Sequence, residues 1–240
     1  MIRALLLAVA LAAMLAPATA RAEDAPRLTV VELFTSQGCS SCPPADAYLG
    51  ELAARPDILA LSFHVEYWNY IGWTDPFAAK FATQRQRDYA KQLGMRYVYT
   101  PQMVVNGTTE GVGSERETIA TLIKAAAADP EHVPLQVTRD VDGTLHVHVD
   151  GAAGTEGARL WLFGFDRMHT TDILRGENEG VQLRNYNVVR SCRDIGSWRG
   201  APLDLTLPRD AAAGDGGIAV VLQLGSGHII GAATLRASTS

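Results

Sequence analysis

The feature that most constrains this chain is a pair of cysteines between a short apolar run and a proline-led segment. Residues 28–34 read Leu-Thr-Val-Val-Glu-Leu-Phe, a β-branched pattern typical of a buried strand. Residues 39–42 read Cys-Ser-Ser-Cys, and Pro43-Pro44 follows directly. Because the first turn of a helix leaves its backbone N–H groups unpaired, proline is well tolerated there and indicates a helix start. The cysteine pair is therefore expected where a strand passes into a helix.

The chain continues this alternation for about another hundred residues. Residues 58–65 predict a second strand, and residues 77–93 predict a polar helix. Thr100-Pro101 then precedes a short strand, and Asn106-Gly107 indicates a hairpin turn. This order of strand, Cys-x-x-Cys, helix and later Thr-Pro resembles the thioredoxin pattern. We expect a thioredoxin-like α/β domain over residues 23–132, with a central mixed sheet and helices on both faces.

The two cysteines have distinct expected roles. The unpaired amides and the dipole at a helix N-terminus favour an anion, which lowers the pKa of a thiol at that position. Cys39 is therefore the expected nucleophile. Cys42 lies one turn further on and can close a small disulfide, so it is the expected resolving thiol. Ser40 and Ser41, between them, are expected to contact the substrate.

Pro101 is the second expected element of the site. In thioredoxin-like folds the corresponding X–Pro bond is cis and lies against the cysteine pair, and cis bonds are essentially confined to X–Pro. A cis bond would present the backbone of Thr100 to an extended substrate. The alternative is a trans proline that enters an edge strand.

Glu32 is the only charge within the apolar run of residues 30–34. A buried carboxylate with a raised pKa could accept the proton of Cys42 during resolution, which makes Glu32 a candidate catalytic residue. The alternative is an acid satisfied by local contacts.

Two other uses of the cysteine pair compete with redox chemistry. A zinc or copper site would need further Cys or His ligands, and only His64 is placed to approach the pair, so we expect no metal. A purely structural disulfide would close a very small loop and stabilise little. We expect no cofactor besides a redox-active Cys39–Cys42 disulfide, and Cys192 is most simply a buried free thiol.

After Pro134 the helical periodicity disappears. Short alternating segments, among them residues 158–165 and 182–190, are separated by glycine-rich turns. This spacing favours a C-terminal antiparallel β-sandwich-like domain over residues 133–240, and an α+β class for the whole chain. The polar segment Arg175–Asn178 is expected either to hydrogen-bond between the domains or to bind a ligand.

The first residues and the charge indicate where the protein acts. A single arginine, an apolar run and small residues before position 22 are the layout of a secretory signal peptide over residues 1–22. The apolar run is shorter than the ~20 residues of a membrane span, so an uncleaved anchor is the weaker alternative. The net charge is −5 and no basic cluster is present. We therefore expect an exported, periplasmic or secreted protein that binds neither nucleic acid nor, after cleavage, a membrane.

Several segments together resemble a bacterial family known as domain of unknown function 1223. They are residues 32–46 around the cysteines, the aromatic run 63–68 with Gly72-Trp73 and Asp75-Pro76-Phe77, residues 99–102, and Arg175–Asn178. The resemblance implies an exported thioredoxin-like domain with a β-rich partner, and it implies no activity. Gly38 stands where thioredoxin usually has a tryptophan, and the serines replace its Gly-Pro, which leaves the direction of electron flow open.

The sequence favours a thiol–disulfide oxidoreductase that acts on protein thiols or disulfides, or on a redox partner protein. Tyr67 and Trp68 are candidate substrate contacts, with packing of a core or lid as the alternative for these aromatic residues. The competing hypothesis is a non-enzymatic thioredoxin-like binding module that recruits a protein, or a metal held by Cys39 and Cys42.

Overall fold

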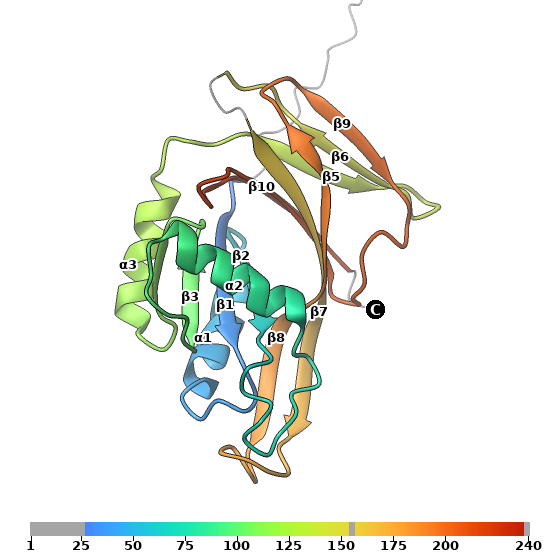
Figure 1. The fold of residues 1–240 in the computed structure, drawn as a ribbon. Helices are drawn as coiled ribbons and strands as arrows, with labels where there is room; N and C mark the ends of the chain where they lie inside the picture. Colours follow the sequence, from blue (N-terminus) through green and yellow to red (C-terminus); the bar gives the residue numbers. More distant parts are fainter. Residues whose placement is uncertain (1–26, 154–156, 238–240) are drawn as a thin grey trace, which may run out of the picture.

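The computed structural model describes residues 27–153 and 157–237 (Figure 1). The expected signal peptide lies outside the described residues. Three helices are present in them: α1 (Pro43–Ala53), α2 (Lys80–Gln92) and α3 (Arg116–Ala127). The strands are β1 (Thr29–Thr35), β2 (Ile58–His64), β3 (Gln102–Val105), β4 (Thr109–Val112), β5 (Leu135–Arg139), β6 (Leu145–Val149), β7 (Ala158–Asp172), β8 (Gln182–Trp198), β9 (Leu203–Leu207), β10 (Gly217–Gln223) and β11 (Ile229–Arg236). None of the described helices is both long and apolar enough to cross a membrane.

The strands form two sheets, of eight and three strands. The large sheet has the order β11-β10-β7-β8-β2-β1-β3-β4, and the small sheet has the order β5-β6-β9. The large sheet is mixed, because β1 runs parallel to β2 and β2 runs parallel to β8, whereas its other pairs are antiparallel. The fold is therefore a mixed α/β arrangement with few helices.

The large sheet contains strands from both parts of the chain. We expected a separate β-sandwich-like domain after residue 132; instead, β7, β8, β10 and β11 extend the sheet that contains β1–β4. The contact runs through Ser62 of β2 and Val188 of β8. Sequence periodicity shows which residues form a strand but not which strand pairs with it, which explains the difference. The division of the chain at residue 132 stays a prediction.

The small sheet packs on the β-rich half of the large sheet. Val147 of β6, Leu160 of β7 and Val220 of β10 belong to one buried hydrophobic cluster. Trp198, at the end of β8, is fully buried in the same cluster. The two sheets therefore share a core.

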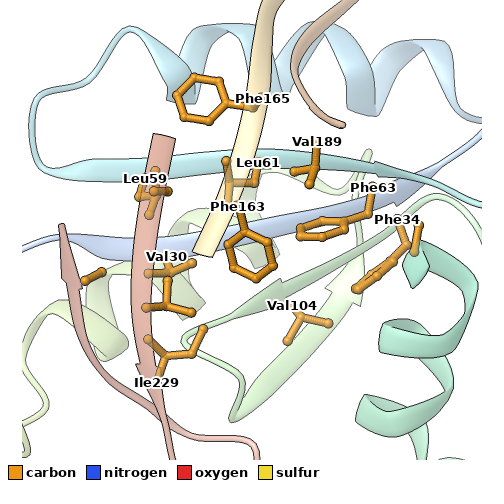
Figure 2. Packing of buried hydrophobic residues seen from close by; sticks show 14 of the residues in the cluster. Val30, Phe34, Leu59, Leu61, Phe63, Val104, Phe163, Phe165, Val189 and Ile229 are labelled. Carbon is orange, nitrogen blue, oxygen red and sulfur yellow. The ribbon is translucent and has the colours of Figure 1, made fainter. Parts of the chain in front are cut away.

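Helices cover both faces of the sheet around β1. Val31 and Leu33 point to one face, where they pack with α1 and α3. Val30 and Phe34 point to the other face, where they pack with α2 and with Phe163 of β7 (Figure 2). This alternation is the two-residue period of a strand that is buried on both faces.

Helix α1 begins as the sequence predicts. Pro43 is its first residue, directly after Cys42 at the N-cap. Ala45, Leu49 and Leu52 form its buried face against β1 and β2. The packing of this helix therefore fixes the position of the cysteine pair relative to the sheet.

Candidate functional site

The two cysteines form a disulfide in the connection between β1 and α1. The Cα atoms of Cys39 and Cys42 are 5.4 Å apart. The backbone N–H of Cys42 donates to the carbonyl of Cys39 at 3.2 Å, and the carbonyl of Cys42 accepts from Ala45 at 2.9 Å. The hydroxyl of Ser41 lies 3.3 Å from the sulfur of Cys39. The pair thus lies at the helix N-terminus, with a hydroxyl beside the first sulfur.

Both sulfur-bearing residues are covered. The exposed fraction is 1% for Cys39 and 0% for Cys42, whereas Ser40 and Ser41 between them are exposed. A substrate that attacks either sulfur therefore needs the covering segments to move. Two segments from elsewhere in the sequence pack on the loop that contains the pair, and we call them covering segments.

The first covering segment is the connection between β7 and β8, residues 173–181, which we call the hairpin tip. The side-chain amide of Asn178 donates to the carbonyls of Gln37 and Cys39 at 2.9 and 3.0 Å. The carboxylate of Glu177 accepts a hydrogen bond from the backbone N–H of Ser40 at 3.3 Å. Asn178 is itself buried. The sequence predicted that residues 175–178 either hydrogen-bond between the two parts of the chain or bind a ligand. The structure contains such hydrogen bonds between the two parts.

The second covering segment is the aromatic loop, residues 65–76. The indole N–H of Trp68 donates to the hydroxyl of Thr100 at 2.7 Å. A Cβ at Gly38 would lie 3.3 Å from the Cβ of Trp68, so the absence of a side chain at Gly38 leaves room for this residue. The hydroxyl of Tyr67 instead donates to Gln86 of α2 at 3.2 Å. The structure therefore brings Trp68 to the cysteine loop and directs Tyr67 toward α2.

The Thr100–Pro101 peptide bond is cis, which confirms the sequence-based expectation for this bond. Gln102 pairs with Phe34 of β1, so Pro101 lies one residue beyond this pair, next to the end of β1 from which the cysteine loop departs. Trp68 links the two loops, since it contacts Gly38 and hydrogen-bonds Thr100. The proline loop and the cysteine loop are thus neighbours.

Glu32 lies away from the disulfide. Its carboxylate accepts hydrogen bonds from the guanidinium of Arg85 on α2 at 2.8–3.1 Å, and both side chains are buried. Arg85 also donates to Tyr89 and to Gln223. Because alternate residues of a strand point to opposite faces, Glu32 shares the face of Val30, whereas α1 packs on the other face. The structure does not bring Glu32 to Cys42.

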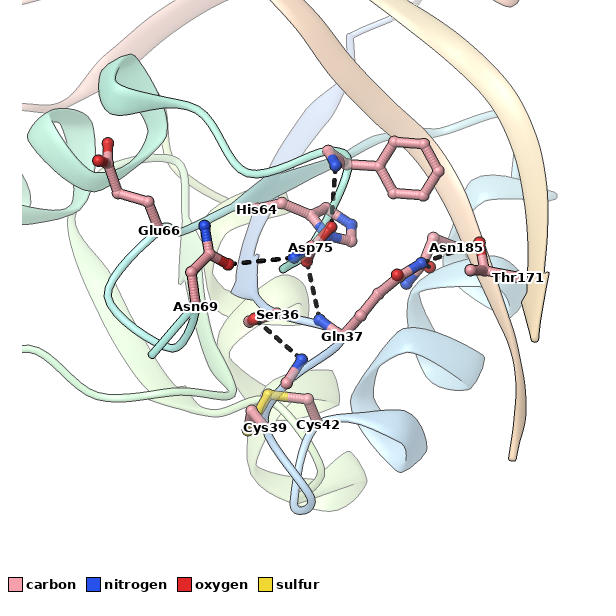
Figure 3. Close-up of polar contacts among 12 residues, drawn as sticks. Ser36, Gln37, Cys39, Cys42, His64, Glu66, Asn69, Asp75, Thr171 and Asn185 are labelled. Atoms are coloured by element: carbon pink, nitrogen blue, oxygen red, sulfur yellow. Dashed lines mark hydrogen bonds and ion pairs between the residues drawn. A yellow bond between two sulfur atoms is a disulfide. The ribbon is translucent and has the colours of Figure 1, made fainter. Parts of the chain in front are cut away.

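A different set of ionisable groups lies on the face of α1. The imidazole Nδ1 of His64, at the end of β2, is 2.7 Å from a carboxylate oxygen of Asp75, and both side chains are fully buried (Figure 3). The same oxygen accepts the backbone N–H of Gln37 at 2.8 Å, two residues before Cys39. Burial opposes the charge of both groups, but their mutual attraction outweighs it: the pKa of His64 is raised and the pKa of Asp75 is lowered.

Asp46 is the third member of this buried set. It lies on α1, four residues after Cys42, and only 3% of it is exposed. Neither carboxylate oxygen has a hydrogen-bond partner of good geometry among the described residues. Burial raises the pKa of Asp46 to about 7, against the opposing attraction of His64 and the polar side chains of Thr35 and Asn185. A carboxyl group with this pKa exchanges its proton near neutral pH.

Sequence reasoning missed this set because its members come from separate segments. Asp46 carried a local signal, a charge on the apolar face of a helix one turn after a cysteine. His64 was considered only as a metal ligand, and Asp75 as a helix cap and as one of the residues that carry the family resemblance. Within residues 27–153 and 157–237, no three His, Cys, Asp or Glu side chains are arranged to hold a metal ion.

Cys192 is a free, half-buried thiol on β8. It lines a cavity of about 370 Å³ together with Arg85 and Trp161. Burial raises the pKa of this thiol to about 11, so it is protonated at neutral pH. Cys192 therefore lacks the thiolate character that a reactive cysteine needs at neutral pH.

Fold and site together define a mixed α/β protein with a covered Cys39–Cys42 disulfide at the N-terminus of a helix. The chain belongs to a family described as "Protein of unknown function (DUF1223)", whose profile matches residues 30–223. The resemblance to this family that the sequence indicates is thereby confirmed.

The chain is also similar to a protein from Agrobacterium tumefaciens with a known crystal structure. The two chains share 33% sequence identity and superpose with a TM-score of 0.78. The match covers 89% of this chain and 96% of the other. A comparison with curated proteins gives no match.

Proposed function

We propose that this protein is an exported, thioredoxin-like thiol–disulfide oxidoreductase that uses Cys39 and Cys42. The observation that carries the proposal is the Cys39–Cys42 disulfide at the start of α1, next to a cis Thr100–Pro101 bond. A helix N-terminus stabilises the thiolate that thiol exchange requires. The nearby hydroxyl of Ser41 can donate a hydrogen bond to that thiolate. A disulfide that closes so small a loop contributes only about 2 kcal/mol by chain entropy, so a structural role explains it less well.

The reaction runs in two exchange steps. With the pair reduced, the Cys39 thiolate attacks one sulfur of a substrate disulfide, forms a mixed disulfide and releases the other substrate sulfur as a thiolate, which takes a proton from solvent. Cys42 then loses its proton and attacks the sulfur of Cys39. The Cys39–Cys42 disulfide forms, the second substrate thiol leaves, and two electrons have passed to the substrate. In the opposite direction, the disulfide oxidises a dithiol substrate.

Exchange requires an open form of the site. In the closed arrangement, Asn178 and Glu177 bind the backbone of the cysteine loop. When the hairpin tip moves aside, the exposed Ser40 and Ser41, the backbone of Thr100 and the indole of Trp68 border the sulfur of Cys39. These residues are the proposed substrate contacts, with Tyr67 further out toward α2. The proposed partners are protein thiols and disulfides or a redox partner protein. We propose that the reaction uses the Cys39–Cys42 disulfide and no other cofactor.

Trapping tests the proposal directly. In Cys42→Ala, the mixed disulfide at Cys39 has no resolving thiol, so covalent complexes with a disulfide-containing protein such as oxidised, scrambled ribonuclease accumulate. Cys192→Ala is the matched control, because it removes the other cysteine and leaves the pair intact. If Cys42→Ala traps no more substrate than Cys39→Ala, which has no attacking thiol at position 39, the oxidoreductase proposal is wrong.

The burial of both cysteines favours one alternative, a binding module with a structural disulfide. In that case the disulfide resists reduction in the folded protein, and a Cys39→Ser/Cys42→Ser variant keeps the function of the intact chain. Metal analysis of the reduced protein separates the metal-binding form of this alternative, which requires stoichiometric zinc or copper on the two thiols.

A further inference from the structure

The chemistry of Cys42 requires a proton acceptor, and the geometry identifies groups other than Glu32. Cys42 and Asp46 lie one turn apart at the start of α1, and the backbone N–H of Asp46 donates to the carbonyl of Cys42 at 3.1 Å. Residues four apart on a helix share a face. Both residues are buried on the face that packs against the sheet. Asp46 is therefore the nearest carboxyl group along the helix from the resolving thiol.

Several buried polar side chains surround the carboxylate of Asp46. The hydroxyl of Thr35, the Nε2 of His64 and the side-chain nitrogen of Asn185 are buried near its carboxylate and make no hydrogen bond of good geometry with the described residues. Buried polar groups normally have a hydrogen-bond partner in the protein or in ordered water, so these atoms are free to bond to Asp46 in either protonation state. A site that takes up and gives back a proton needs such groups, because its hydrogen bonds differ between the two states.

The charges that face this cluster come from four segments. Asp75 of the aromatic loop binds the imidazole of His64 from one side, and Asp46 of α1 attracts it from another. Arg190 of β8 opposes its charge. On Asp46 itself, His64 acts as the attracting charge and Asp75 as the repelling one. The imidazole of His64 therefore interacts with both carboxyl groups, and its hydrogen bond to Asp75 stabilises its charged form.

A pocket adjoins Asp46, although its carboxylate oxygens are themselves buried. Asp46 lines a pocket of about 430 Å³ between α1 and β8, together with Pro43 and the exposed Arg184. Val181 of the hairpin tip lines the same pocket, so Asp46 and the hairpin tip border one surface hollow.

From this arrangement we propose that Asp46 accepts the proton of Cys42 during resolution and that the buried His64–Asp75 pair positions and tunes it. The inference rests on the proposed function. Asp46, as the proposed acceptor of the thiol proton, has the role of a catalytic residue, while His64 and Asp75 act through it and are positioning residues. The carboxylate of Asp46 takes the proton from the Cys42 thiol, the resulting thiolate attacks Cys39, and the proton then passes to solvent. The raised pKa of Asp46 suits this transfer at neutral pH.

The resolving step can be isolated with glutathione. Reduced protein is mixed with excess oxidised glutathione, quenched with acid, and analysed by mass spectrometry for the glutathione adduct at Cys39 and for the closed disulfide. The decay of the adduct measures resolution by Cys42. In the intact chain, we expect this rate to rise with pH through an inflection near 7. In Asp46→Asn we expect resolution to slow roughly a hundredfold at pH 8 and to lose that inflection.

The positioning residues have a different signature. Because His64→Gln removes a positive charge beside Asp46, it should move the inflection upward by about one pH unit rather than abolish it. His148→Gln is the matched control, since His148 also pairs with a carboxylate, Asp204, but is exposed and lies in the small sheet. Unchanged rates and an unchanged inflection in both Asp46→Asn and His64→Gln would overturn the inference.

A second measurement does not depend on activity or on variants that fold poorly. Carbon-13 NMR of the labelled aspartate carboxyl groups in the oxidised, intact chain reports the pKa of Asp46. We expect a value near 7, and an ordinary aspartate value would overturn the inference. If the intact chain forms no glutathione adduct at all, the proposed function fails as well; if it forms and resolves the adduct independently of Asp46, only this inference fails.

Discussion

The side-chain amide of Asn178 donates a hydrogen bond to the backbone carbonyl of Cys39 at 3.0 Å, across 139 residues of sequence. The same amide binds the carbonyl of Gln37. Asn178 is buried by this contact, and the cysteine that it covers is only 1% exposed. The long β7–β8 hairpin from the β-rich part of the chain (Figure 1) therefore binds the backbone of the loop that contains the disulfide.

Removal of this contact should make the disulfide easier to reach. Asn178→Ala loses two hydrogen bonds worth about 2 kcal/mol in total, which raises the open fraction of the hairpin tip roughly thirtyfold. We expect the rate of disulfide reduction by dithiothreitol to rise by a similar factor, measured by thiol labelling under native conditions. Gln182→Ala is the control, because Gln182 binds Asp172 in the last strand pair before the hairpin tip and is exposed. Equal rates for Asn178→Ala and the control would contradict the covering role of Asn178.

Glu32 is expected to matter for stability rather than for exchange. Its buried ion pair with Arg85 lies on the face of the sheet opposite α1. Removal of Glu32 leaves the charge of Arg85 buried without its partner. We expect Glu32→Gln to lower the free energy of unfolding by about 3–5 kcal/mol, measured by urea denaturation. Arg116→Met, which breaks the exposed pair with Glu51, should cost less than about 1 kcal/mol. A Glu32→Gln variant that is stable but slow only in resolution would restore the catalytic role predicted from the sequence.

Asp46 should make stability depend on pH in a defined direction. Its pKa is raised from 3.8 to about 7 in the folded protein. The folded state therefore binds the proton more tightly than the unfolded state, so this stabilisation is complete below pH 4 and is lost as the pH rises to 7. Asp46→Asn has no such loss. We expect the variant to gain on the order of 4 kcal/mol relative to the intact chain between pH 4 and pH 8, measured by denaturation at both pH values. An equal difference at both values would contradict the raised pKa.

The local part of the site could be predicted from the sequence. Pro43 at the helix start, the apolar face of α1 and the cis bond before Pro101 all follow from patterns of a few residues. The Cys39–Cys42 disulfide is equally local, because two residues separate the cysteines. Such features depend on nearest neighbours along the chain, and the sequence contains those neighbours.

The rest of the site depends on pairings that no local pattern contains. Strand β7 extends to Asp172 and β8 begins at Gln182, so the hairpin continues well beyond the apolar residues that predicted a strand end near Phe165. Beyond that point its side chains are largely exposed, and no hydrophobic alternation marks the strand. The same limit applies to Glu32: its charge was visible in the sequence, but its partner Arg85 lies 53 residues away.

The most direct test of the account is the equilibrium of the Cys39–Cys42 pair with glutathione. The intact protein is incubated in buffers of graded reduced and oxidised glutathione, and the fraction of closed disulfide is measured by alkylation and mass spectrometry. We predict reversible reduction, with a midpoint within the range of about −270 to −120 mV that exchange-active pairs cover. A pair that stays oxidised in all of these buffers, with a potential below about −300 mV, would be a structural disulfide and would contradict the account.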